Sequence, residues 1–237
     1  MPTTDRESAA RPAVLILGAG GHGRVVLDIL NLAGRYRAVG FLDNNPAIRG
    51  RRVDGLVVYG GINDLPRFAA ELGCEGVIVA IGDNGVRRGL ARDAEQAGIR
   101  LINAIHPSAA IAGNARLGQN VVVAAGAIIG ANCQIGDSVI LNTGAVVDHQ
   151  TMIGEGAHVC PGARIAGRVI IESGAFVGIG ATVIPKIRIG NEAIIGAGAV
   201  VIEDVPPLAT AVGAPARTID LMHASEDEVA LVLPLRV

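Results

Sequence analysis

The sequence predicts an α/β domain over residues 12–105, followed by a parallel β-helix over residues 106–218. The first segment alternates apolar runs with stretches of helical spacing, and in the second an aliphatic residue recurs at every sixth position. A chain with 33 Gly, 3 Phe, 2 Tyr and no Trp must also fill its core with small and aliphatic side chains in regular layers. Residues 1–11 are expected to form a disordered N-terminus, and residues 219–237 a C-terminal tail.

The first unit has the pattern of a small Rossmann-like domain. Short apolar runs that end near Gly or Asp predict buried parallel strands at 13–17, 36–42 and 76–81. Helical spacing predicts helices at 22–33, 62–72 and 84–97. This alternation is typical of about half of a doubly wound nucleotide-binding fold.

The second unit is built from six-residue repeats. From Ile111 to Val201, 16 consecutive hexads keep one aliphatic residue in register, and the fifth position of each hexad is mostly small. Each hexad therefore supplies one bulky and one small inward side chain and forms one flat side of a prism. Three hexads complete a coil of 18 residues, and the coils stack by parallel β pairing.

Charge and cysteine content exclude several classes of protein. A formal net charge of -2 without runs of Lys or Arg argues against nucleic-acid and anionic-membrane binding. Three Cys without CxxC spacing argue against a disulfide framework or a zinc knuckle. The polar first dozen residues and the lack of a long apolar stretch argue against a leader or a membrane span. We expect a soluble cytoplasmic protein.

Several motifs resemble those of one family. The hexads follow the pattern [LIV]-G-x-x-[small]-x, and they are accompanied by VLILGAGGHGRVVLDIL, GFLDN, AIGDN, HPSA and VGAPAR. Together these motifs resemble the hexapeptide-repeat sugar acyltransferases of the sialic-acid O-acetyltransferase type, which include N-acetyltransferases of nucleotide-linked 4-amino sugars. The resemblance implies a left-handed β-helix and a homotrimer with active sites between subunits. It also implies acetyl-CoA as co-substrate and a UDP- or GDP-linked amino sugar as acceptor, in polysaccharide or glycan biosynthesis.

A glycine-rich motif, Gly18-Ala-Gly-Gly-His-Gly23, follows a predicted strand and opens a predicted helix. Its backbone N–H groups can hold a phosphate or pyrophosphate. The motif alone leaves three interpretations open: an NAD-dependent enzyme, a structural glycine turn and a nucleotide-sugar site. The first lacks a separate catalytic domain, and the resemblance favours the third. We expect the nucleotide sugar to be bound by Gly20, Gly21, His22, Gly23, Asp43, Asn44 and Asn142.

Acyl transfer from a thioester needs a base and donors for the developing oxyanion. Histidine is the side chain suited to the first task near neutrality. Of the 5 His, His106 and His223 are expected to be structural from their positions. The resemblance implies that His149, at an outward hexad position, is the general base and that His158 lies near the thioester. Nine residues are half a coil, so we expect two subunits to contribute these two histidines if they share a site.

Gly167 follows His149 by 18 residues and is therefore expected one coil away, over the histidine. The resemblance implies that its N–H is the oxyanion donor, while a corner glycine is the structural alternative. The family often places a carboxylate directly after the base, but this chain has Gln150. Asp148 or Glu155 could replace that carboxylate, and the sequence leaves this open.

Coenzyme A is expected to lie along the C-terminal coils. The residues expected to contact it are His158, Gly167, Gly178, Gly180, Lys186, Ala197, Gly198 and Pro215, with Arg217 as a further phosphate contact. The small residues among these also have packing explanations.

The β-helix has two other possible functions besides acyl transfer: a zinc site and a structural scaffold. A zinc site like that of β-helix carbonic anhydrases needs a stacked histidine pair, and none of His106, His149 and His158 is 18 residues from another, so no metal is expected. A purely structural scaffold is the other reading. The favoured hypothesis is direct N-acetylation with His149 as base, and the alternative is O-acetylation of a sugar or of sialic acid.

Overall fold

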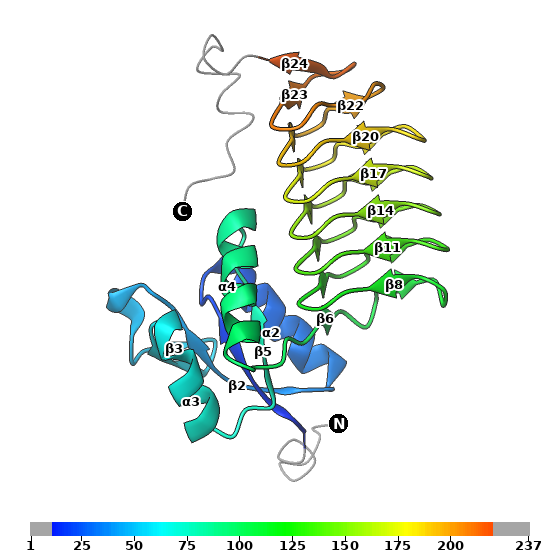
Figure 1. Ribbon diagram of the computed structural model, residues 1–237. Coiled ribbons are helices and arrows are strands. Elements are labelled where there is room, and N and C mark those ends of the chain that lie inside the picture. Colours follow the sequence, from blue (N-terminus) through cyan, green and yellow to red (C-terminus); the bar gives the residue numbers. More distant parts are fainter. Residues whose placement is uncertain (1–10, 220–237) are drawn as a thin grey trace. The chain divides into compact units, whose positions relative to one another are not determined.

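The computed structural model describes residues 11–219, which form two compact units that divide between Pro107 and Ser108 (Figure 1). The N-terminal segment predicted at 1–11 and the tail predicted at 219–237, with His223, lie almost wholly outside the described residues. None of the helices within 11–219 has the length and hydrophobicity needed to cross a bilayer.

The first unit is a mostly parallel sheet with helices and one antiparallel edge strand. Its elements are β1 (Ala13–Leu17), α2 (Gly21–Ala33), β2 (Arg37–Leu42), η1 (Pro46–Ile48), β3 (Arg52–Val53), β4 (Leu56–Gly60), η2 (Ile62–Asp64), α3 (Leu65–Glu71), β5 (Gly76–Val79), α4 (Asn84–Gln96) and β6 (Ala104–Ile105). The sheet order is β3-β4-β2-β1-β5, with β1 parallel to both β2 and β5. The hairpin of β3 and β4, which turns at Asp54 and Gly55, was not among the predicted strands: β3 has only two residues, and β4, although as long as β1, was missed.

The second unit is a three-sided prism of stacked coils. One face has the order β22-β19-β16-β13-β10-β7, a second has the order β20-β17-β14-β11-β8, and the third includes β24-β23-β21-β18-β15-β12-β9. On the first face these strands are β7 (Ala110–Ile111), β10 (Ile128–Ile129), β13 (Val146–Val147), β16 (Arg164–Ile165), β19 (Thr182–Val183) and β22 (Val200–Val201). The second face holds β8 (Arg116–Leu117), β11 (Gln134–Ile135), β14 (Met152–Ile153), β17 (Ile170–Ile171) and β20 (Arg188–Ile189). The third holds β9 (Val122–Val123), β12 (Ile140–Leu141), β15 (His158–Val159), β18 (Phe176–Val177), β21 (Ile194–Ile195), β23 (Thr210–Val212) and β24 (Arg217–Ile219).

Pairing follows the predicted period. Ile129 pairs with Val147 and Val147 with Ile165, so each coil advances by 18 residues in parallel register. The second residue of each short strand points inward, and Val147 and Ile165 are fully buried. The predicted fold class, a Rossmann-like domain followed by a left-handed parallel β-helix, is confirmed.

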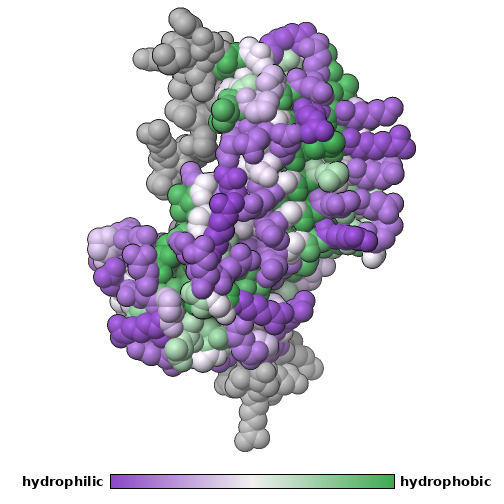
Figure 2. Space-filling model, viewed as in Figure 1, coloured by the Kyte–Doolittle hydropathy of each residue, from purple (hydrophilic) through white to green (hydrophobic). Residues whose placement is uncertain are grey.

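The first and second faces both carry exposed apolar side chains. Ile128 on the first face and Met152 on the second are 45% and 46% exposed, respectively. Figure 2 shows hydrophobic residues in a band along the coils, with hydrophilic residues stacked beside them.

Candidate active site

His149 lies at the corner where the chain passes from β13 on the first face to β14 on the second. Its side chain is 48% exposed. It borders a pocket of about 290 Å³ whose other lining residues are Asp148, Ala166, Gly167, Arg168, Pro185 and Lys186. These residues come from three successive coils, because the corner repeats every 18 residues.

Gly167 occupies the same corner one coil further on. The two coils are held in register by the N–H of Arg168, which donates to the carbonyl of His149 at 2.9 Å. A Cβ on Gly167 would lie 2.5 Å from Nε2 of His149, so only glycine leaves room for the ring. Within residues 11–219 the N–H of Gly167 has no protein acceptor. The corner therefore combines the Nε2 atom of His149 with a backbone N–H that has no protein acceptor among the described residues.

The imidazole of His149 has polar neighbours on both sides. Its Nδ1 lies 3.3 Å from Oε1 of Gln150, and that same oxygen accepts a hydrogen bond from Nε of Arg168 at 3.0 Å. Asp148 Oδ2 lies 4.0 Å from Nε2, too far for a hydrogen bond. Glu155 lies beyond β14 and does not line this pocket. Gln150 is thus the side chain that contacts Nδ1.

His158 lies elsewhere in the chain, on strand β15 of the third face. It is only 9% exposed, its Nε2 lies 3.2 Å from Nδ2 of Asn142, and its ring meets Phe176 edge-on at 5.3 Å. The Oδ1 of Asn142 accepts the N–H of Thr143, so its amide nitrogen faces the ring. The structure brings Asn142 and His158 together but does not bring them to the pocket of His149.

Of the residues expected to bind coenzyme A, Gly167 and Lys186 line the His149 pocket, and the others lie elsewhere on the prism. Gly178, Gly180, Ala197 and Gly198 lie where the third face passes into the first. A Cβ on Gly178 would lie 2.7 Å from the N atom of Ala197, so coil stacking itself requires this glycine, and Gly180 and Gly198 have positive φ. Pro215 and Arg217 lie at the β23–β24 turn and on β24.

The cysteines are poor nucleophiles. Burial raises the pKa of Cys160 to about 12 and also raises the pKa of Cys133, whose Sγ contacts the carbonyl of Asp148 at 3.1 Å. Within residues 11–219 no three His, Cys, Asp or Glu side chains gather as a metal site would require.

In the first unit the glycine-rich loop lies at the carboxyl end of β1 and opens helix α2. Asp43 holds this loop, because its Oδ2 accepts the N–H of Ala19 and its Oδ1 that of Asn45, both at 2.8 Å. The Oδ1 of Asn44 accepts the N–H of Ile62 at 2.9 Å. These two side chains, which the sequence suggested as ligand contacts, tie together the loops that border the carboxyl edge of the sheet.

The glycines of this loop separate into two kinds. A Cβ on Gly23 would lie 2.0 Å from the carbonyl oxygen of Gly18, so packing of the helix against the loop requires glycine there. A Cβ on Gly20 or Gly21 would meet nothing within 4 Å. The packing of the unit does not explain Gly20 and Gly21, whereas the open space above them suits an approaching ligand.

His22 is partly buried at this edge, near the fully buried Arg87. Burial and the Arg87 guanidinium lower the pKa of His22 to about 4, and among the described residues its Nε2 is buried without a hydrogen-bond partner. Arg87 is fully buried and donates to the carbonyl oxygens of Ile81 and Gly82. Burial lowers the pKa of Arg87 to about 10, so it stays charged at neutrality. Sequence reasoning missed Arg87, since nothing local marks an arginine on a helix as buried.

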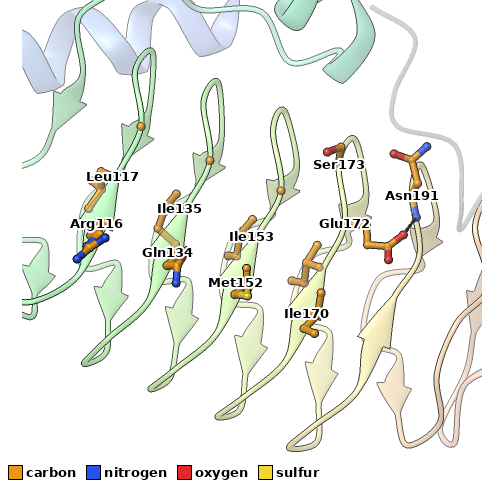
Figure 3. A pocket seen from close by; sticks show the side chains of 14 residues that line it. Arg116, Leu117, Gln134, Ile135, Met152, Ile153, Ile170, Glu172, Ser173 and Asn191 are labelled. Carbon is orange, nitrogen blue, oxygen red and sulfur yellow. Dashed lines mark hydrogen bonds between the residues drawn. The ribbon is translucent and has the colours of Figure 1, made fainter.

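A larger groove of about 560 Å³ runs along the second face of the prism (Figure 3). Its walls include Gln134, Met152, Ile170 and Glu172, and Glu172 accepts the N–H of Asn191 at 2.9 Å. None of the predicted site residues lines it.

Comparisons with known proteins match both units. Residues 13–94 match the family model described as PglD N-terminal domain. Over 117 residues the chain is 38% identical to UDP-N-acetylbacillosamine N-acetyltransferase from Bacillus subtilis (strain 168), a match that spans 47% of this chain and only 51% of that relative.

Two solved structures match most of the chain. One is PerB from Caulobacter crescentus in complex with CoA and GDP-perosamine, with 43% identity, a TM-score of 0.84, and coverage of 89% of this chain and 99% of that one. The other is the acetyltransferase domain of PglB from Neisseria gonorrhoeae in complex with acetyl coenzyme A, with 34% identity, a TM-score of 0.83, and coverage of 89% and 100%.

Proposed function

The chain belongs to the hexapeptide-repeat family of nucleotide-amino-sugar N-acetyltransferases, and on that premise we propose that it acetylates the 4-amino group of a UDP- or GDP-linked sugar with acetyl-CoA. The observation that carries this proposal is the corner at which His149 Nε2 lies against Gly167, whose N–H is available. This corner supplies the base and the oxyanion donor that attack on a thioester needs.

The pocket can perform the transfer in one complex. Acetyl-CoA supplies the acetyl group as a thioester. Nε2 of His149 takes a proton from the sugar amine as the amine nitrogen bonds to the carbonyl carbon, and the N–H of Gly167 donates to the carbonyl oxygen as it gains charge. When the C–S bond breaks, His149 returns the proton to the departing sulfur. The products are an amide and a thiol, and His149 is again neutral.

The glycine-rich loop holds the nucleotide in this proposal. The open backbone of Gly20 and Gly21 at the start of α2 faces the pyrophosphate, where helix N-termini favour anions. His22 and Gly23 complete the turn, and Asp43 and Asn44 keep it in place through their hydrogen bonds to backbone N–H groups.

Coenzyme A binding and catalysis are completed by a neighbouring subunit. His149 and the corner of Gly178, Gly180, Ala197 and Gly198 lie at opposite edges of the first face, so one protomer cannot place them together. That face carries partly exposed Ile128, Val146 and Val200. A threefold ring closed through it buries these residues and brings the two corners of adjacent subunits together. The neighbour's His158, Asn142 and Pro215 then approach the same cleft, and Lys186 and Arg217 are available for phosphates.

A cytoplasmic location is part of the proposal. All three cysteines are free thiols, which is typical of a reducing compartment.

The test is a thiol-release assay with acetyl-CoA and a panel of UDP- and GDP-linked 4-amino sugars, free sialic acid and serine. We expect release with an amino sugar and a decrease of about a hundredfold or more in His149→Ala. Arg116→Ala, which changes an exposed residue outside the pocket, is the control and should retain full activity. Turnover with hydroxyl acceptors alone would replace N-acetylation by O-acetylation, and full activity of His149→Ala would refute the mechanism.

A further inference from the structure

The hydrogen bonds around His149 form a chain that ends at Arg168. Gln150 and Arg168 occupy the same corner position in consecutive coils, and both adopt the left-handed backbone conformation, with φ of 58° and 63°. Nε of Arg168 donates to Oε1 of Gln150 at 3.0 Å, and Nδ1 of His149 lies 3.3 Å from the same oxygen.

This chain determines which way the Gln150 amide faces. A guanidinium nitrogen can only donate a hydrogen bond, so the atom of Gln150 that faces Arg168 must be the oxygen. That oxygen can only accept, so Nδ1 of His149 must carry the proton when it bonds to Gln150. The neutral ring then has its free lone pair on Nε2, the nitrogen that lies against Gly167.

We propose that Arg168 acts through Gln150 as a positioning residue that sets the tautomer of His149. This inference rests on the proposed function, since the tautomer affects turnover only if His149 is the base. An ionised carboxylate after the histidine would accept from Nδ1 in either orientation. An amide can instead rotate and present its NH₂ group, which favours the tautomer with a proton on Nε2. Arg168 removes that alternative.

The other charged groups around the ring do not substitute for Arg168. Asp148 Oδ2 lies 4.0 Å from Nε2, a position that favours a proton on the wrong nitrogen. Lys186 lines the same pocket one coil beyond Gly167. With Arg168 removed, Asp148 and a rotated Gln150 both favour the inactive tautomer.

The kinetic test is a double-mutant comparison in the full-length protein. We expect Arg168→Ala to lower kcat by roughly tenfold to a hundredfold, within the roughly 10²–10⁴-fold that a general base contributes, and to change KM much less. Adding Gln150→Glu should restore most of this kcat, because a carboxylate needs no orienting donor. Gln150→Glu alone should shift the acidic limb of the pH–kcat profile to higher pH, because a carboxylate stabilises the imidazolium.

The matched control is Arg116→Ala, which removes an exposed arginine from strand β8, away from this pocket. The inference is overturned if Arg168→Ala leaves kcat unchanged. It is also overturned if the loss is the same with and without Gln150→Glu, because Arg168 would then act on the substrate or on the fold.

A second measurement reads the tautomer without any substrate. Histidine-labelled protein contains 5 imidazoles, and the His149→Asn variant assigns the signal of interest in ¹⁵N–¹H correlation spectra. We expect the proton on Nδ1 in the wild type and a shift toward Nε2 in Arg168→Ala. A wild-type proton on Nε2 refutes the inference. If the tautomer is as expected but no amino sugar is acetylated, the proposed function fails while the assignment of Arg168 stands.

Discussion

Gly167 lies against the imidazole of His149 so closely that a Cβ on Gly167 would lie 2.5 Å from Nε2 and 2.6 Å from Cε1. The two residues are one coil apart, and the backbone hydrogen bond from Arg168 to His149 holds the spacing. The base and the donor proposed for catalysis therefore share one small volume, and a single methyl group is enough to disturb it.

Gly167→Ala should displace the His149 ring. We expect kcat to fall by about a hundredfold or more, because the base would no longer be positioned to take the proton. Gly113→Ala is the matched control, because Gly113 occupies the same corner position three coils before Gly167 and a Cβ there meets nothing within 4 Å. Steady-state kinetics with both variants check this. Equal activities would show that the position of the ring does not matter.

Gly21→Ala should raise KM for the nucleotide sugar while leaving KM for acetyl-CoA unchanged. A Cβ at Gly21 meets no protein atom within 4 Å, so the fold should keep its stability. Gly89→Ala is the control: Gly89 is an exposed residue in the middle of α4, and its replacement should stabilise the helix by about 0.5–1 kcal/mol with no change in KM. A KM for the nucleotide sugar that is unaffected by Gly21→Ala would argue against ligand binding at the loop.

His22 should make the protein less stable as the pH falls. Burial and Arg87 lower its folded pKa to about 4 from the ordinary 6.5, so the unfolded chain binds the proton more readily between these values. The contribution of His22 to the free energy of unfolding is fully present above pH 6.5, and it declines as the pH falls toward about 4. Denaturant unfolding across this range should show a shallower decline for His22→Asn than for the wild type. Parallel curves would show that His22 does not titrate in this way.

Ile128→Glu should dissociate the proposed trimer and abolish acetyl transfer, because Ile128 lies between Ala110 and Val146 on the first face and burying a charge beside these apolar side chains is costly. Met152→Glu is the control, since Met152 is exposed to nearly the same extent, 46% against 45%, but lies on the second face. Sedimentation of both variants distinguishes the faces. A trimer that survives Ile128→Glu and dissociates in Met152→Glu would assign the interface to the second face instead.

The β-helix was predictable because its rule is local. Every sixth residue from Ile111 to Val201 is aliphatic, and the pairing of Val147 with Ile165 follows from that period alone. The 18-residue spacing likewise placed Gly167 over His149. The hairpin of β3 and β4 was not predicted, because β3 has only two residues and β4, which is half-buried along most of its length, lacks the continuous burial of β1.

The functional details depend on the directions in which side chains point, and the six-residue repeat does not determine these directions. Sequence alone left open whether Asp148, Gln150 or Glu155 contacts the base, and the structure shows Gln150 at Nδ1 with Arg168 behind it. Asp43 and Asn44 are expected to contact the ligand, and the structure adds a second role, since their oxygens accept backbone N–H groups of the surrounding loops.

The sequence by itself determined the two-unit architecture, the stacking of the coils and the alignment of His149 with Gly167, because repeat spacing and backbone pairing are set by residues near one another in the chain. Only the tertiary structure decided that Arg87 is buried beside His22 and that Arg168 orients Gln150. Those contacts depend on side-chain rotamers and desolvation, which arise only when separate turns, coils and helices pack together.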